Sequence, residues 1–131
     1  MAEGYIPNNI SHGTWVPDIP RMNISSIIQS SWYRAGNIFI ADISIVFGTP
    51  ISGQENNNIY LNAVSLPCNG GNLNSKSLSG IWSFDDEIGS GNISCTTNNS
   101  NGWFCTNTGR IQSYKFSGKT MSFHLFYTVD F

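Results

Sequence analysis

The segment Ser31–Phe47, which reads SWYRAGN followed by IFIADISIVF, decides the fold of this chain. Gly36 and Asn37 form a pair that is typical of a tight turn. The even positions after this turn include Asp42 and Ser44, whereas the odd positions are all apolar: Phe39, Ala41, Ile43, Ile45 and Phe47. An alternation with a period of two predicts a β-strand with one face in the core.

The beginning of this strand is apolar on both faces, because Ile38 and Ile40 stand between the core-facing positions. Strands that are apolar on both faces are normally covered on both sides. We therefore expect Ile38 and Ile40 to contact a second sheet or another subunit. Asp42 and Ser44 mark the point where that contact is expected to end.

Further segments with strand character follow one another along the chain. Met1–His12 shows no periodicity and is expected to be an extended lead-in or linker. Gly80 is expected to mark a bulge within its strand. Met22–Trp32 has Ile24, Ile27 and Ile28 at helical spacing, but it is rich in Ile and Ser, which are mediocre helix formers, so a strand is favoured over a helix there. The remaining strands are expected at Gly13–Pro17, Ile59–Leu66, Lys76–Phe84, Asn92–Thr97, Gly102–Thr108, Arg110–Phe116 and Met121–Phe131.

This pattern predicts an all-β fold, an antiparallel β-sandwich or jelly-roll-like barrel of about eight or nine short strands. A chain of 131 residues is long enough to bury one core. We expect a single domain over residues 13–131. Alternating apolar residues continue to the last position, so we also expect that end of the sequence to lie in the sheet.

The composition argues against nucleic acid and membrane partners. Charged residues make up 11% of the chain, against about 25% in typical globular proteins, and the net charge is −2. Six Lys and Arg residues, scattered along the sequence, do not form the basic surface that phosphate backbones require. No apolar run reaches the roughly 20 residues of a membrane span, and the first ten residues do not resemble a signal peptide. We expect neither membrane insertion nor Sec export.

The three cysteines, Cys68, Cys95 and Cys105, do not match a zinc-binding spacing. Cys95 and Cys105 lie on either side of an expected hairpin turn, so a disulfide between neighbouring strands is one interpretation. The alternative is that they are partly buried thiols without a bridge.

Few residues suggest metal binding or catalysis, and we expect no cofactor. The acidic turn Asp85, Asp86 and Glu87 is a weak calcium candidate, because it lacks the alternating ligands of an EF-hand loop. His12 and His124 have no nucleophile motif or acidic partner nearby in the sequence, so we expect both to be surface or interface residues. The chain is therefore not expected to be an enzyme.

Aromatic residues offer a better clue, since they form 13% of the chain. Exposed aromatic rings stack on sugar faces, and Asn and Asp side chains bind hydroxyl groups. Trp82 and Trp103 also have a core interpretation. The candidate receptor-binding residues are Trp82, Phe84, Asp85, Asn98, Asn101, Trp103 and Tyr114.

Three motifs stand in order along the first half of the chain: GTWVP at Gly13–Pro17, WYRAGN at Trp32–Asn37 and VSLP at Val64–Pro67. Together they resemble the C-terminal head domains of bacteriophage tail fibres and related receptor-binding proteins. Such domains commonly show a Gly-Thr-Trp-x-Pro opening, a Tyr-x-x-x-Gly-Asn turn and an Ile-x-Gly-Leu-Pro element. This chain departs from the pattern at Ser65, which replaces the glycine, and Cys68–Phe116 matches no motif of the family.

The resemblance implies a β-sandwich that assembles as a homotrimer at a fibre or spike tip and binds the bacterial surface without catalysis. Its implied partners are a bacterial cell-surface glycan or surface protein and other virion tail proteins. The implied location is the virion, exposed to the extracellular medium, after synthesis in the host cytoplasm without a signal peptide. Ile38 and Ile40 are then candidate subunit-interface residues.

Other functions stay open at this point. A structural virion protein that decorates or joins parts would have the same fold and assembly. A soluble carbohydrate-binding module would be a monomer with weak affinity for a simple sugar. A small hydrolase would need convergent titratable groups that the sequence does not display.

Overall fold

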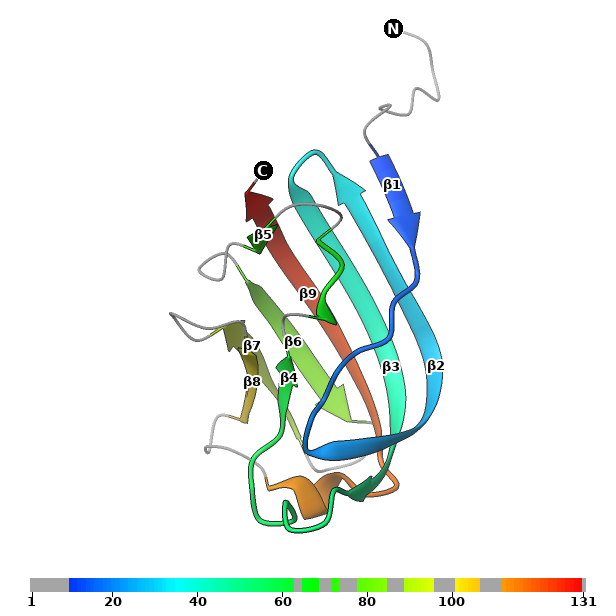
Figure 1. Ribbon diagram of the computed structural model, residues 1–131, viewed down its shortest axis with the longest axis vertical. Coiled ribbons are helices and arrows are strands. Elements are labelled where there is room, and N and C mark those ends of the chain that lie inside the picture. Colours follow the sequence, from blue (N-terminus) through cyan, green and yellow to red (C-terminus); the bar gives the residue numbers. More distant parts are fainter. Residues whose placement is uncertain are drawn as a thin grey trace, which may run out of the picture.

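The computed structural model describes residues 10–62, 65–68, 72–73, 78–84, 89–95, 101–106 and 112–130, which form nine strands in one antiparallel sheet. The strand order is β1-β2-β3-β9-β6-β7-β8-β4, with β5 paired to β9 (Figure 1). The all-β class expected from the sequence is confirmed. The elements are β1 Ile10–Gly13, β2 Met22–Ala35, β3 Ile38–Pro50, β4 Tyr60–Asn62, β5 Asn72–Leu73, β6 Ser79–Phe84, β7 Ser90–Cys95, β8 Asn101–Thr106, the 3-10 helix η3 Ser113–Phe116 and β9 Thr120–Asp130.

The hairpin β2-β3 is the longest pairing in the sheet, and its turn lies at Gly36 and Asn37, as predicted. Gly36 has a φ angle of +62°, a conformation that glycine adopts without steric cost. The odd positions of β3 from Phe39 to Phe47 are all buried. The predicted core face is thus confirmed, and the segment Met22–Trp32 is a strand, as expected.

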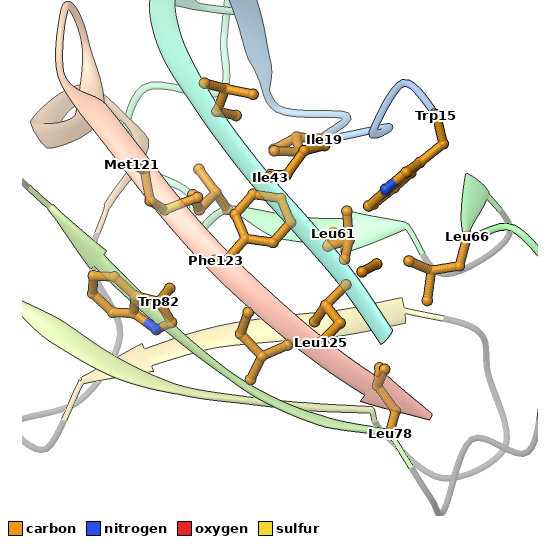
Figure 2. Packing of buried hydrophobic residues seen from close by; sticks show 14 of the residues in the cluster. Trp15, Ile19, Ile43, Leu61, Leu66, Leu78, Trp82, Met121, Phe123 and Leu125 are labelled. Carbon is orange, nitrogen blue, oxygen red and sulfur yellow. The ribbon is translucent and has the colours of Figure 1, made fainter. Parts of the chain in front are cut away.

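The core lies on one side of β3 and β9 and is closed by residues from the other end of the sheet. Figure 2 shows Leu61 of β4 on the same side of these strands as Ile43 and Phe123, and all three belong to one buried cluster. Ile93 of β7 and Trp15 join the same cluster. The sheet therefore curls, so that β4 and β7 face β3 and β9 across the core.

Hydrogen bonds from the loop between β1 and β2 reach β4, the strand at the opposite end of the strand order. The backbone N–H of Asn62 in β4 donates a hydrogen bond of 2.8 Å to the carbonyl of Asp18 in this loop. Arg21 Nη1 donates one of 2.5 Å to the carbonyl of Asn58. These bonds hold β4 beside the segment that leads into β2.

The strand expected at Gly13–Pro17 is wrong, because β1 ends at Gly13 and begins at Ile10, inside the expected lead-in. Beyond Gly13 the chain leaves the ladder so that Trp15 enters the core. The backbone N–H of Trp15 donates a hydrogen bond of 3.0 Å to Ser30 Oγ, a side-chain atom on β2, instead of to a neighbouring strand.

The edge strand expected at Arg110–Phe116 is also wrong, because Ser113–Phe116 forms η3. Long-range contacts override the local pattern here. The N–H of Ser113 donates to the carbonyl of Asn57 at 2.8 Å, which draws the chain towards the loop after β3. The ring of Phe116 is fully buried and lies 4.9 Å from that of Phe84, measured between centroids.

No register shift occurs at Gly80, so the expected bulge is wrong. Gly80 instead permits a close backbone approach, because a Cβ atom there would lie 2.3 Å from the carbonyl oxygen of His124. The hairpin β7-β8 is confirmed, but Cys95 is opposite Gly102 and Cys105 is opposite Asn92. An offset of this size separates the two cysteine Cα atoms by roughly 10 Å, which is too far for a disulfide.

The first two motifs of the phage-fibre resemblance meet at one corner of the sheet. Gly13 is opposite Trp32 in the β1-β2 register, and a Cβ atom on Gly13 would lie 2.7 Å from Trp32 Nε1. Trp32 Nε1 donates to the carbonyl of Thr14 at 3.2 Å. Arg34 Nε donates to the carbonyl of Gly36 at 2.6 Å, within the turn that starts β3. Gly13 is therefore needed for the indole ring to cover the backbone.

The third motif joins this corner through the core. Leu66 is buried in the same cluster as Trp15, and Figure 2 shows both at the same end of the core. The hydroxyl of Tyr127 donates to the carbonyl of Pro67 at 3.0 Å. The Tyr127 ring in turn stacks on Phe39, with 5.2 Å between centroids. Parts of all three motifs thus belong to one packed unit.

Replacing Gly80 with Ala is expected to lower the free energy of unfolding by about 2–3 kcal/mol, because the new methyl group overlaps a backbone oxygen that cannot rotate away. The matched control is Gly48→Ala in β3, where the nearest atom to an added Cβ, the carbonyl oxygen of Asn23, lies at 3.4 Å. That control should cost less than about 1 kcal/mol. Urea unfolding measures both, and equal effects would contradict the close approach at Gly80.

Replacing Tyr127 with Phe should cost about 1 kcal/mol at neutral pH, because a buried hydrogen bond to Pro67 is lost. Tyr114→Phe, at an exposed ring, should have no measurable effect. The pKa of the Tyr127 phenol is raised above its ordinary value of 10.0, mainly by burial and to a smaller extent by the negative charge of the nearby Cys68 thiolate.

This raised pKa gives a second measurable consequence. Above about pH 10 the unfolded chain loses the phenol proton while the folded chain keeps it, so the stability that Tyr127 contributes falls as pH rises. The difference in unfolding free energy between the wild type and Tyr127→Phe should be constant below about pH 10 and shrink above it. A difference that stays constant in alkaline solution would contradict the raised pKa.

Candidate functional site

Two of the predicted receptor-binding residues, Trp82 and Phe84, belong to the core. Their exposed fractions are 1% and 9%, and their rings meet edge to face at 5.6 Å. On β6 they lie opposite Phe123 and Met121, two core-facing residues of β9. Both are therefore inaccessible to a ligand on the surface, and their assignment as contact residues is corrected.

Tyr114 is a predicted contact residue that the structure shows to be exposed. It lies on η3 with 49% of its surface exposed, and Lys115 Nζ lies 6.0 Å from the ring centroid. Asn101 and Trp103 are located in β8, where Trp103 is opposite Tyr60 of β4. Asp85 and Asn98 lie outside the described residues. These assignments stay predictions.

The calcium candidate, Asp85 to Glu87, also lies outside the described residues. Within the part of the chain that the structure describes, no three His, Cys, Asp or Glu side chains gather into a group that could hold a metal ion. The same part contains no helix that is long and apolar enough to cross a membrane.

The outer face of the sheet, on the side away from the core, carries a row of aligned side chains. His12, Tyr33, Ile40 and Phe126 are successive partners across β1, β2, β3 and β9. The rings of His12 and Tyr33 lie 6.4 Å apart. Ser79 of β6 completes the row opposite Phe126.

Five large apolar side chains on this face form what we call the outer patch: Tyr33, Ile38, Ile40, Ile81 and Phe126. Their exposed fractions range from 39% at Ile38 to 56% at Ile81. A hollow of about 240 Å³ lies along Ile38 and Ile40, lined also by Tyr33, Arg34 and Ala35. The described residues leave Ile38 and Ile40 partly exposed, so a contact with another subunit stays a prediction.

A titratable pair borders the outer patch. Asp42 and His124 are opposite each other in the β3-β9 register, and His124 Nδ1 is hydrogen-bonded to Asp42 Oδ1. One step further along, Ser44 Oγ and Ser122 Oγ share a hydrogen bond of 2.6 Å. Sequence reasoning missed this pair, because 82 positions separate the two residues and only the strand register brings them together.

The Asp42–His124 pair resembles two members of a catalytic triad, but its surroundings favour a contact surface. A triad needs a nucleophile bonded to the second imidazole nitrogen and donors aimed at an oxyanion. The Ser122 hydroxyl, on the same face as His124, is bonded to Ser44 instead. The His124 side chain is 58% exposed on an open sheet, which does not exclude water from a reacting group.

A second hollow, of about 250 Å³, lies on the outer face between β6 and β7. Ile81 and Asn92 are opposite each other in its wall, as are Ser83 and Ser90. Hydroxyl and amide groups beside an aliphatic side chain suit a small polar ligand or a peptide. The hollow is open and contains no charged side chain.

Comparisons of this chain with protein-family models, with curated protein sequences and with solved structures found no match. Function therefore has to follow from the chain itself. The features that bear on it are the corner where the three motifs meet, the outer patch and the Asp42–His124 pair beside it.

Proposed function

We propose that this chain is the head domain of a bacteriophage tail fibre or spike, which binds the bacterial host surface without catalysis. The observation that carries the proposal is the corner described above. Gly13 makes room for Trp32, Arg34 closes the turn before β3, and Leu66 packs with Trp15. Motifs that resemble one family thus have mutually dependent structural roles, as is expected of inherited elements of one domain.

The surface chemistry supports a binding role. A surface with few charges and many Asn, Ser and Thr side chains presents hydrogen-bonding groups at little electrostatic cost, which suits contact with neutral glycans or with protein. Tyr114 adds an exposed ring beside Lys115. A rigid sheet that supports such groups at its loops needs no cofactor and no moving part.

In this proposal the chain acts as a homotrimer in the virion, attached to other tail proteins, and several weak sites act together. Multivalent binding raises avidity by about 10² to 10⁴ over a single site. The receptor is a cell-surface glycan or a surface protein. Candidate contact residues are Tyr114, Asn101 and Trp103, together with Asp85 and Asn98.

A structural virion protein that joins or decorates parts is the second candidate. The burial of Trp82 and Phe84 favours it, because two aromatic rings that were expected to meet a receptor are part of the core. The two candidates share the fold and the assembly but differ in whether the free protein adsorbs to cells.

Fluorescently labelled protein, tested on a panel of bacterial strains, should bind one or more of them reversibly and saturably. The double variant Asn101→Ala with Trp103→Ala, and separately Tyr114→Ala, should each reduce binding at least about tenfold while the melting temperature changes little. Val16→Ala, at an exposed residue 69% accessible in the β1-β2 loop, is the control and should bind as the wild type does.

Three results would contradict the proposal. Assembled protein that binds no strain favours the structural role. A monomer with weak affinity for a simple sugar identifies a carbohydrate-binding module. Release of sugars or peptides from the cell surface during binding would show an enzyme.

A further inference from the structure

We infer that the outer patch is the surface through which copies of this chain associate. The inference deepens the proposed function, on which it rests only in that copies of the chain assemble. The contact itself does not depend on receptor binding.

The patch is continuous over four adjacent strands, β2, β3, β9 and β6. Tyr33, Ile40 and Phe126 are direct cross-strand partners, and Ile38 lies two positions before Ile40 on the same face. With β1 included, the face comprises the four residues of β1, the six of β6 and about eight each of β2, β3 and β9. At about 4.8 Å between strands and about 3.4 Å per residue, it measures on the order of 550 Å². A contact between two such faces buries roughly 1,100 Å², which exceeds the roughly 1,000 Å² expected of a biological interface.

The charge of this face favours a copy of the same chain over a charged ligand. The register positions that share the outer face on β2, β3, β9 and β6 carry no Lys or Arg. Arg34 lines the hollow at one end of the patch, but its guanidinium lies over the Phe39 ring and is bonded to the Gly36 carbonyl. Phosphate groups, acidic glycans and acidic peptides would therefore find no counter-charge there. In a symmetric assembly, residues close to the symmetry axis meet their own equivalents, so charges at the centre would repel each other. An uncharged apolar centre satisfies that condition.

The border of the patch also fits an interface. Asp42 and His124 lie next to Ile40 and Phe126 along their strands and are bonded to each other, so neither needs a charged partner from another copy. Beyond them, Ser44 and Ser122 are bonded in the same way. An apolar centre with a polar, satisfied border is the usual anatomy of a protein interface.

Sedimentation equilibrium of the full chain tests the inference. The wild type should have the mass of an assembly, and Ile40→Lys and Phe126→Lys should each raise the dissociation constant at least about 100-fold, because a lysine would be buried without a partner. The matched control is Ile51→Lys. Ile51 is as exposed as Ile38, at 39%, but lies in the loop after β3, so the control should stay assembled.

Folding and geometry are checked separately. The circular dichroism spectrum and urea midpoint of each lysine variant should show a folded chain. Ile40→Cys, placed near the symmetry axis, should give covalently joined chains on oxidation, whereas Ile51→Cys should not. This second variant keeps the inference testable if Ile40→Lys does not fold.

Several results would overturn the inference. One is a wild type that is monomeric at all concentrations. Another is an assembly that persists in both lysine variants. A wild-type monomer that associates only after removal of residues 1–9 would assign the patch to that segment. Failure of the proposed function is distinguishable, because an assembly that dissociates in Ile40→Lys but never adsorbs to bacteria leaves the contact intact.

Discussion

Residues Ile38–Val46 of β3 pair one to one with Thr128–Thr120 of β9, without a bulge. This register assigns every side chain of the two strands to the core or to the outer face. A slip by one residue would expose the ring of Phe39 and bury the carboxylate of Asp42. The same pairing aligns Ile40 with Phe126 and brings Asp42 to His124. The core and the outer patch therefore both depend on this single antiparallel ladder.

The core uses most of the aromatic side chains that the structure describes. Trp82, Phe84 and Phe116 form one cluster of ring contacts, and Phe39 stacks on Tyr127. Aromatic rings suit this interior because each buries about 150–250 Å², so a few of them fill much of a small core. Aromatic content alone was therefore a weak indicator of a binding surface in this chain.

Regular strands could be predicted from the sequence, and irregular elements could not. The alternation in β3 and β9 repeats often enough to determine both the strand and its buried face. By contrast, Trp15 and Phe116 leave the expected strands because their rings pack in the core. The backbone N–H of Trp15 donates to Ser30 Oγ, and that of Ser113, three residues before Phe116, donates to the carbonyl of Asn57 in the loop after β3. Such contacts join residues far apart in the sequence, and local patterns contain no trace of them.

The candidate site depends even more on contacts between residues that are far apart in the sequence. Ile38 and Ile40 were expected to contact a second sheet or another subunit, and their position on the face away from the core follows from alternation alone. Phe126 and Ile81 join them only through the order β3-β9-β6, which no local signal contains. The Asp42–His124 pair depends on that order as well. A surface built from four strands is predictable from sequence only once the strand order is known.

The two ends of the sheet influence how copies can associate. Unpaired strand edges invite further chains to add in register, and such growth does not close. Here the N–H of Asn62 in β4 is bonded to Asp18, so that edge is partly occupied by the chain itself. A contact through the outer face is made by side chains and not by strand pairing, so the assembly can close around a symmetry axis. The proposed association through the apolar outer face, together with the partly occupied β4 edge, therefore favours a finite assembly over a fibril.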